Sequence, residues 1–167
     1  MISDEVVALI REVRLVVFDF DGVLTDNAVY VSQEGTEFVR CWRSDGLGLQ
    51  ALAAIGIDLL VLSTEQNPVV SVRCAKLKLP CIQAVADKGE RLAQVLAERK
   101  LDWRQVAYVG NDINDSACLR RVGLPVVVGD AHPDVLPLAK WQTEARGGYG
   151  AVREFCDRFV THRTNSR

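Results

Sequence analysis

The stretch "VVFDFDGVLTDN", residues 16–27, decides the fold. An apolar run ends in two carboxylates, Asp19 and Asp21, which are separated by a single residue. Side chains two positions apart on an extended chain point to the same side. Asp19 and Asp21 can therefore share one site while Phe18 and Phe20 face the other way. A buried strand that ends in such a pair is typical of a ligand site at the carboxyl edge of a parallel sheet.

Strand-like and helix-like segments alternate on both sides of this stretch. The clearest helix is residues 87–100, where Leu92, Val95 and Leu96 recur at helical spacing and Asp87 with Glu90 fits a capping box. The alternation predicts an α/β fold with a doubly wound, mostly parallel sheet that carries helices on both faces. The predicted strands are residues 15–20, 58–62, 81–85, 106–109 and 125–128. The other predicted helices are residues 45–55, 68–77, 116–122 and 151–160.

Residues 27–42 interrupt the first strand-to-helix crossover. Two β-rich runs flank Glu34 and Gly35, which predicts a β-hairpin inserted after the first strand. A chain of 167 residues without a linker-like stretch favours one domain over residues 1–167. We expect its C-terminal tail, residues 144–167, to lie near the active site.

Composition and charge exclude several classes of protein. The net charge of −2 gives no reason to expect nucleic acid or an anionic membrane as a partner. Early acidic residues and short apolar runs argue against a signal peptide or a membrane span. Five widely spaced cysteines without a CxxC pattern are typical of reduced thiols. We therefore expect a cytoplasmic protein.

Polar side chains also follow the later strands. Ser63 and Thr64 follow the second predicted strand, Lys88 opens the helix after the third, and Asn111 with Asp112 follows the fourth. Because the carboxyl ends of parallel strands meet at one edge, four segments deliver polar groups to one place. This set suits phosphoryl transfer, with a divalent cation between the carboxylates and the phosphate dianion. Oxygen-rich ligands of this kind favour Mg²⁺.

The residue types suggest separate roles. Asp19 would be the nucleophile and would form an aspartyl-phosphate intermediate. Asp21 would protonate the leaving alcohol and then deprotonate the attacking water. Ser63, Thr64 and Lys88 would hold the phosphate oxygens.

Four segments carry a family resemblance: "FDFDGVLTD", "LSTE", "DK" and "GNDIND". In this order they resemble the four motifs of the haloacid dehalogenase superfamily. "RSDGLGLQAL", "VGLPVVVGDAHPDV" and "GGYGAVREFCD" extend the likeness to its small capless branch. That branch contains octulosonate 8-phosphate phosphatases, nonulosonate 9-phosphate phosphatases and modules of some acylneuraminate cytidylyltransferases. The resemblance implies a Mg²⁺-dependent phosphatase and a homotetramer in which the hairpin packs between subunits.

The resemblance also implies further site residues. Asp19 and Asp21 would bind the metal together with Asn111 or Asp112, and Asp115 would support them. We expect Asp45, Glu65, Arg146 and Tyr149 to lie around the leaving group of the substrate. Two features depart from the octulosonate phosphatases: Asn111 replaces an aspartate, and Tyr149 replaces an arginine. Asn111 and "LSTE" favour the acylneuraminate-associated relatives.

The resulting hypothesis is a phosphatase that acts on a phosphorylated 2-keto-3-deoxy sugar acid. A nonulosonate 9-phosphate is favoured over octulosonate 8-phosphate. The alternative is a non-catalytic tetramerisation module that partners an acylneuraminate cytidylyltransferase. Asn111 in place of an aspartate is the feature that supports this alternative. A phosphoacceptor receiver domain is disfavoured because its acceptor aspartate follows the third strand, whereas the DxD pair here follows the first.

Overall fold

A parallel six-stranded sheet forms the centre of the structure, which is a computed structural model that describes residues 2–164. Its strand order is β5-β4-β1-β6-β7-β8, and every neighbouring pair is parallel. The strands are β1 (Leu15–Phe18), β4 (Asp58–Leu62), β5 (Cys81–Ile82), β6 (Val106–Gly110), β7 (Leu124–Val127) and β8 (Trp141–Gln142). From β1 the chain first builds the sheet toward β4 and β5, and then returns to add β6, β7 and β8 on the other side of β1. Residues 15–18 therefore lie in the middle of the sheet.

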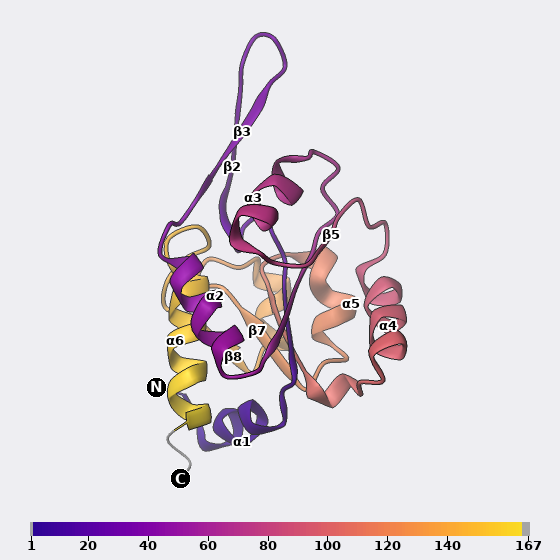
Figure 1. Cartoon of the computed structure of the whole chain (residues 1–167), viewed down its shortest axis with the longest axis vertical. Coiled ribbons are helices and arrows are strands. Elements are labelled where there is room, and N and C mark those ends of the chain that lie inside the picture. Colours follow the sequence, from indigo (N-terminus) through magenta and orange to yellow (C-terminus); the bar gives the residue numbers. More distant parts are fainter. Residues whose placement is uncertain (1, 165–167) are drawn as a thin grey trace.

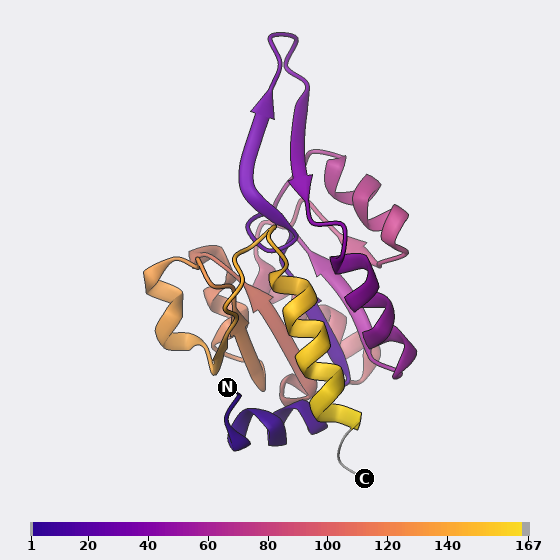
Figure 2. The same cartoon turned by 90° about the vertical axis from the view of Figure 1, so that its left-hand side faces the viewer.

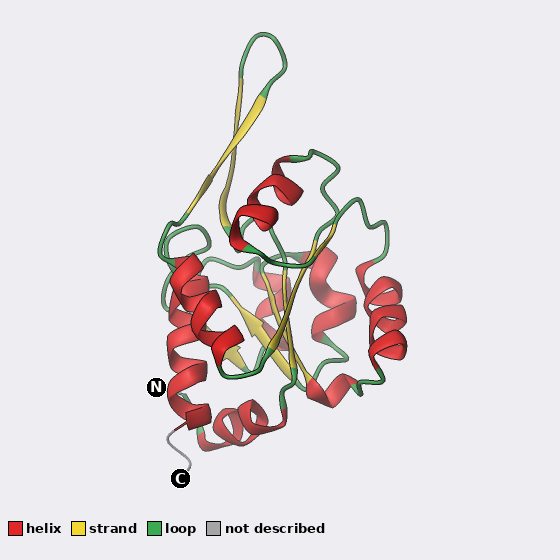
Figure 3. Cartoon of the chain, viewed as in Figure 1, coloured by secondary structure: helices red, strands yellow, loops and turns green. Residues whose placement is uncertain are grey.

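Helices cover both faces of the sheet (Figure 3). One face packs against α1 (Asp4–Glu12), α2 (Asp45–Ala54), α3 (Val69–Leu77) and α6 (Ala151–Thr164). The other face packs against α4 (Lys88–Arg99), α5 (Ser116–Leu119) and the 3-10 helix η3 (Pro133–Leu138). Strand β1 alternates between these two cores, since Val16 and Phe18 lie in the first and Leu15 and Val17 in the second. The predicted doubly wound fold is confirmed.

The inserted hairpin consists of β2 (Thr25–Val31) and β3 (Glu37–Cys41), which pair antiparallel as a separate two-stranded sheet. It projects away from the body of the chain in both views (Figures 1 and 2). Large apolar side chains stand exposed on it, at Val29, Tyr30, Val31 and Phe38. Only the base of the hairpin, at Val39 and Cys41, packs against the core of its own chain, and the rest presents an apolar surface outward.

The structure differs from the sequence prediction at several boundaries. Helix α1 and strand β8 were not predicted. The first strand ends at Phe18 rather than Phe20, because the Phe20 carbonyl accepts hydrogen bonds from the next turn of backbone. The strand predicted over residues 81–85 is only two residues long, as β5, and the helix predicted over residues 116–122 ends at Leu119, as α5. Within residues 2–164, no helix combines the length and the apolar character that a membrane span requires.

Candidate active site

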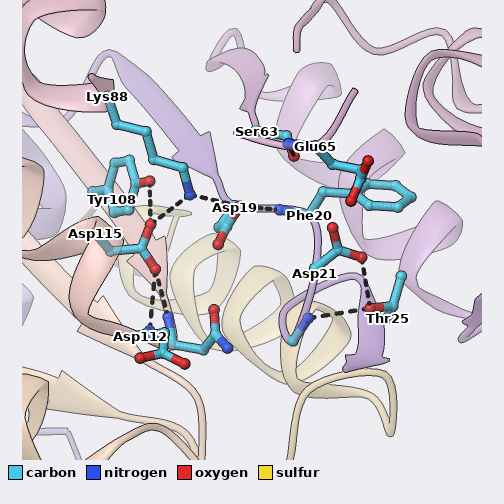
Figure 4. A network of polar contacts seen from close by, with 12 residues as sticks. Asp19, Phe20, Asp21, Thr25, Ser63, Glu65, Lys88, Tyr108, Asp112 and Asp115 are labelled. Atoms are coloured by element: carbon cyan, nitrogen blue, oxygen red, sulfur yellow. Dashed lines mark hydrogen bonds and ion pairs between the residues drawn. The ribbon is translucent and has the colours of Figure 1, made fainter. Parts of the chain in front are cut away.

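The polar residues predicted from the sequence gather at the carboxyl edge of the sheet (Figure 4). Asp19 follows β1, Ser63 follows β4, and Asn111 follows β6, while Lys88 begins α4. Strand β1 pairs directly with both β4 and β6, so the residues that follow these strands become neighbours. Asp19, Ser63, Lys88 and Asn111 are all buried. So many polar groups can be buried together only when they pair with one another through hydrogen bonds and ion pairs.

Asp19 lies at the centre of the site. Lys88 Nζ is 2.7 Å from Asp19 Oδ1, and the backbone N–H of Phe20 donates to the same oxygen at 2.6 Å. Burial and, to a smaller extent, the nearby Asp115 carboxylate raise the pKa of Asp19 to about 7, against the opposing effects of the Lys88 ammonium and the Phe20 N–H. A bound cation would favour the ionised form, which is the form that a nucleophile needs.

Asp115 joins the lysine to the loop after β6. Its Oδ1 lies 2.8 Å from Lys88 Nζ and accepts from the Tyr108 hydroxyl at 2.7 Å. Its Oδ2 accepts from the backbone N–H groups of Asn111 at 2.9 Å and Asp112 at 3.3 Å. Figure 4 shows Lys88 between Asp19 and Asp115. Burial lowers the pKa of Lys88, but the two carboxylates together raise it above its ordinary value, so the ammonium stays charged.

Asp21 occupies a more open position on the loop after β1. The Thr25 hydroxyl donates to Asp21 Oδ1 at 3.4 Å and accepts from the Gly22 N–H at 3.1 Å. Gly22 has φ of 78°, a left-handed conformation that glycine adopts without strain. Burial raises the pKa of Asp21, and the carboxylate of Glu65 raises it further. A raised pKa favours the protonated form, which suits a general acid.

Three oxygen atoms converge at Asn111. Its amide oxygen lies 3.0 Å from the Asp21 carbonyl oxygen and 3.3 Å from Asp19 Oδ2. In this orientation of the amide none of these oxygens can donate to another, so a bound cation would be needed to satisfy all three. Adjacent ligands of an octahedral Mg²⁺ at roughly 2.1 Å lie about 3.0 Å apart, which this arrangement fits. Without a cation, the Asn111 amide group would instead be rotated by 180°, and its nitrogen would donate to the Asp21 carbonyl and to Asp19 Oδ2.

The other candidate ligand, Asp112, also lines the pocket, but its Oδ1 accepts from the Ile113 N–H at 2.7 Å. No group of three or more His, Cys, Asp or Glu side chains suited to a metal occurs in residues 2–164. A metal in this pocket must therefore use an amide or a carbonyl oxygen beside the carboxylates, as the Asn111 geometry allows.

The pocket at this edge has a volume of about 330 Å³. Its lining residues are Asp19, Asp21, Asn27, Thr64, Asn111, Asp112, Ile113 and Asn114. Asn27, Ile113 and Asn114 were not predicted from the sequence, although all three adjoin the motifs. Ser63 and Lys88 lie behind the lining rather than in it, and Ser63 Oγ accepts from the Glu65 N–H at 3.1 Å.

The predicted leaving-group residues do not line this pocket. Asp45 is fully buried, and its Oδ1 accepts from the Arg153 N–H in the first turn of α6 at 3.0 Å. Glu65 lies beside the site, but its Oε1 accepts from the N–H groups of Gln66 and Asn67, each at 2.7 Å. Asp45 therefore serves the contact between α2 and α6, and Glu65 closes its own turn.

Arg146 and Tyr149 belong to an aromatic cluster at the base of the hairpin. The guanidinium groups of Arg40 and Arg146 lie 4.3 Å and 5.0 Å from the Tyr149 ring centre. Trp42 packs against the same ring with centroids 6.1 Å apart. Arg40 Nη1 also donates to the Gly148 carbonyl at 2.9 Å. These contacts connect β3 to the loop before α6.

That loop packs directly on the segment that carries Asp21. The Gly148 N–H donates to the Val23 carbonyl at 3.1 Å. A side chain at Gly147 would collide with the Gly22 carbonyl oxygen, so only glycine fits there. Residues near the two ends of the chain thus meet backbone to backbone at the site.

Comparisons with known proteins agree with this geometry. Residues 72–154 match the family model of the haloacid dehalogenase-like hydrolases. The chain is 34% identical over 157 residues to the 3-deoxy-D-manno-octulosonate 8-phosphate phosphatase of Yersinia pestis. The aligned residues cover 93% of this chain and 84% of the relative.

Solved structures extend the likeness. A haloacid dehalogenase-family hydrolase from Streptomyces avermitilis is 43% identical with a TM-score of 0.87, covering 90% of this chain and 86% of that one. The octulosonate 8-phosphate phosphatase of Moraxella catarrhalis, solved with magnesium, phosphate and KDO, is 29% identical with a TM-score of 0.93. That match covers 97% of this chain and 94% of the other.

Proposed function

Because this chain belongs to the haloacid dehalogenase-like hydrolases and is a phosphomonoester hydrolase of their octulosonate-phosphatase type, we propose that it hydrolyses a phosphorylated 2-keto-3-deoxy sugar acid. The observation that carries this proposal is the buried set of Asp19, Lys88 and Asp115 beside the open Asp21. Octulosonate 8-phosphate is the first candidate, because it is the substrate in the names of the relatives. A nonulosonate 9-phosphate, favoured by "LSTE" and Asn111, is the second.

The reaction begins at Asp19. A carboxylate oxygen of Asp19 attacks phosphorus, the aspartyl phosphate forms, and the bond from phosphorus to the leaving oxygen breaks. Asp21 gives its proton to that oxygen, as its raised pKa allows. Asp21 then takes a proton from the water that attacks the aspartyl phosphate, which releases phosphate and restores both carboxyl groups. Its exposure on the pocket side allows contact with both the leaving group and water.

In this scheme Thr64 would contact the phosphate from the pocket wall, and Ser63 and Lys88 would act on it from directly behind the lining. The Lys88 ammonium is fixed by Asp115 and offsets the charge of Asp19 and of the incoming dianion. Asp19, the Asp21 carbonyl and Asn111 would hold Mg²⁺, with Asp112 beside them. Bound Mg²⁺ would neutralise part of the phosphate charge. Asp115 acts through Lys88 and the loop after β6.

A homotetramer is the second part of the proposal. The hairpin exposes Tyr30 to 58%, Val31 to 63% and Phe38 to 58% of their surfaces. Exposed apolar patches of this kind mark interaction sites, and unpaired strand edges invite pairing. We infer that hairpins from several copies cover one another.

Phosphate release tests the enzyme assignment. The purified chain is assayed with octulosonate 8-phosphate and a nonulosonate 9-phosphate in Mg²⁺, with EDTA and Asp19→Asn as controls. We expect turnover that both controls abolish. Full activity of Asp19→Asn would exclude the nucleophile assignment, and the absence of turnover of either sugar-acid ester by the wild type would overturn the substrate proposal.

A further inference from the structure

Two carboxamide side chains in the pocket are not used by the proposed chemistry. Asn27 and Asn114 line the pocket from different segments, one at the root of the hairpin and one in the 3-10 helix η2 (Ile113–Asp115). Among residues 2–164, neither carboxamide makes a hydrogen bond with another residue. Both asparagines are exposed. Their donors and acceptors are therefore available to a bound molecule.

The backbone holds Asn27 in an unusual conformation. Its φ is 62°, in the left-handed region, and the register of the hairpin shifts between Thr25 and Val29. Bulges of this kind re-aim side chains beside active sites, and left-handed non-glycine residues gather at ligand contacts. The Asn27 N–H donates to Thr25 Oγ1 at 3.3 Å, the hydroxyl that also contacts Asp21. Asn27 is thus tied to the residue that meets the leaving oxygen.

Asn114 is held in place by its neighbour Asp115, in a segment that lies far from Asn27 in the sequence. It lies between Ile113 and Asp115, and the Asp115 carboxylate is anchored by Tyr108 and Lys88. Since Asp115 also holds the loop after β6, the position of Asn114 follows that of the candidate metal ligands. Asn27 therefore borders the proposed acid, Asp21, and Asn114 borders the candidate metal ligands.

The charge of the lining restricts what these asparagines can meet. Every charged side chain that lines the pocket is a carboxylate: Asp19, Asp21 and Asp112. The nearest arginines of the hairpin base, Arg40 and Arg146, lie over the Tyr149 ring. Among the charged groups that line the pocket, a carboxylate next to the phosphate ester would meet only other carboxylates, whereas hydroxyl groups can donate to and accept from carboxamides.

We infer that Asn27 and Asn114 form a leaving-group subsite for a neutral, polyhydroxylated carbon chain adjacent to the phosphate ester. This inference rests on the proposed function and refines it. A sugar acid fits the subsite when its carboxylate lies at the far end of the chain from the phosphate. An acid with its carboxylate close to the ester is rejected.

The test compares esters that differ beside the phosphate. Sorbitol 6-phosphate offers neutral hydroxyls, 3-phosphoglycerate places a carboxylate near the ester, and p-nitrophenyl phosphate has no hydroxyl. We expect kcat/KM to favour sorbitol 6-phosphate over 3-phosphoglycerate. Asn27→Gly keeps the left-handed backbone and removes the carboxamide, and Asn114→Ala removes the other. Each should lower the ratio of kcat/KM for sorbitol 6-phosphate to that for p-nitrophenyl phosphate about two- to twelvefold, which corresponds to the loss of one hydrogen bond worth about 0.5–1.5 kcal/mol.

A matched control is Lys100→Gly, because Lys100 also has a left-handed φ, 56°, but lies outside the pocket. It should leave the ratio unchanged. Equal losses on both esters, or no loss, in Asn27→Gly and Asn114→Ala would overturn the subsite. Calorimetric binding of sorbitol 6-phosphate in the Asp19→Asn background separates this result from failure of the proposed function. There, weaker binding upon Asn27→Gly supports the subsite even if no ester is turned over, and unchanged binding refutes it.

Discussion

Asp45 offers a direct test of how burial controls a carboxyl group in this fold. It is fully buried and its Oδ1 accepts from the Arg153 N–H, whereas its Oδ2 has no hydrogen-bond partner among residues 2–164. Burial raises the pKa of Asp45 from an ordinary 3.8 to about 7, against the opposing effects of the Arg153 N–H and of the Arg73 and Arg153 charges. Asp45→Asn keeps an oxygen for the Arg153 N–H and removes the buried charge.

The sign of the effect follows from the two pKa values. The folded chain holds the Asp45 proton more tightly than the unfolded chain, so ionisation destabilises the fold as pH rises from about 4 to about 7. Each pKa unit corresponds to 1.36 kcal/mol, so the penalty grows by about 3 kcal/mol between pH 5 and pH 8. An asparagine carries no such penalty. We therefore expect the stability of Asp45→Asn relative to the wild type to rise by about 2–3 kcal/mol over this range.

Urea unfolding, followed by tryptophan fluorescence at pH 5 and pH 8, measures this difference. Using the difference between variant and wild type cancels every other titrating group that the two proteins share. A difference that is the same at both pH values would refute the reasoning, because it would mean that Asp45 has an ordinary pKa in the fold. Turnover measured in parallel distinguishes the structural role from the leaving-group role, since only the latter predicts a large loss of kcat/KM.

Three further changes probe other parts of the molecule. Asn111→Asp adds a negative charge among the converging oxygens and should tighten Mg²⁺ binding about tenfold in calorimetry without substrate, about 1.4 kcal/mol; unchanged affinity would exclude Asn111 as a ligand. Gly147→Ala should displace the Asp21 loop and lower kcat at least about tenfold. Gly35→Ala strains a left-handed backbone but meets open space far from the Asp21 loop, so it should lower kcat much less; equal kcat values would contradict the packing argument. Phe38→Lys should dissociate the proposed tetramer in sedimentation experiments, and a wild type that already sediments as an active monomer would argue against that assembly.

The sheet and the central site could be predicted because both depend on local sequence. Buried parallel strands are short apolar runs, and the residue that ends each run must reach the same edge. Asp19, Ser63, Lys88 and Asn111 follow from this rule without knowledge of side-chain packing. The hairpin was predictable for a similar reason, since its alternating runs flank a turn.

The rim of the site could not be predicted in the same way. Asn27 reaches the pocket because of a left-handed residue within a register shift, which no local pattern signals. Asp45 lies at the start of a helix, where a carboxylate can face either solvent or a neighbour. Its burial depends on the close approach of α2 to α6, where a side chain at Gly48 would meet Cys156. Tertiary contacts of this kind decide roles that residue type leaves open.

The contact between the glycine loop and the segment after β1 bears on how the enzyme is made. Gly148 hydrogen-bonds to Val23, which lies 125 positions earlier in the chain (148 − 23). During synthesis the nucleophile and the acid emerge early, but the loop that supports the acid emerges much later, just before α6. A nascent chain can therefore form much of its sheet on the ribosome and still lack the final support of Asp21. Hydrolytic activity should appear late in translation, after residue 148 has left the exit tunnel, so that interrupted products carry the motif without a finished catalyst.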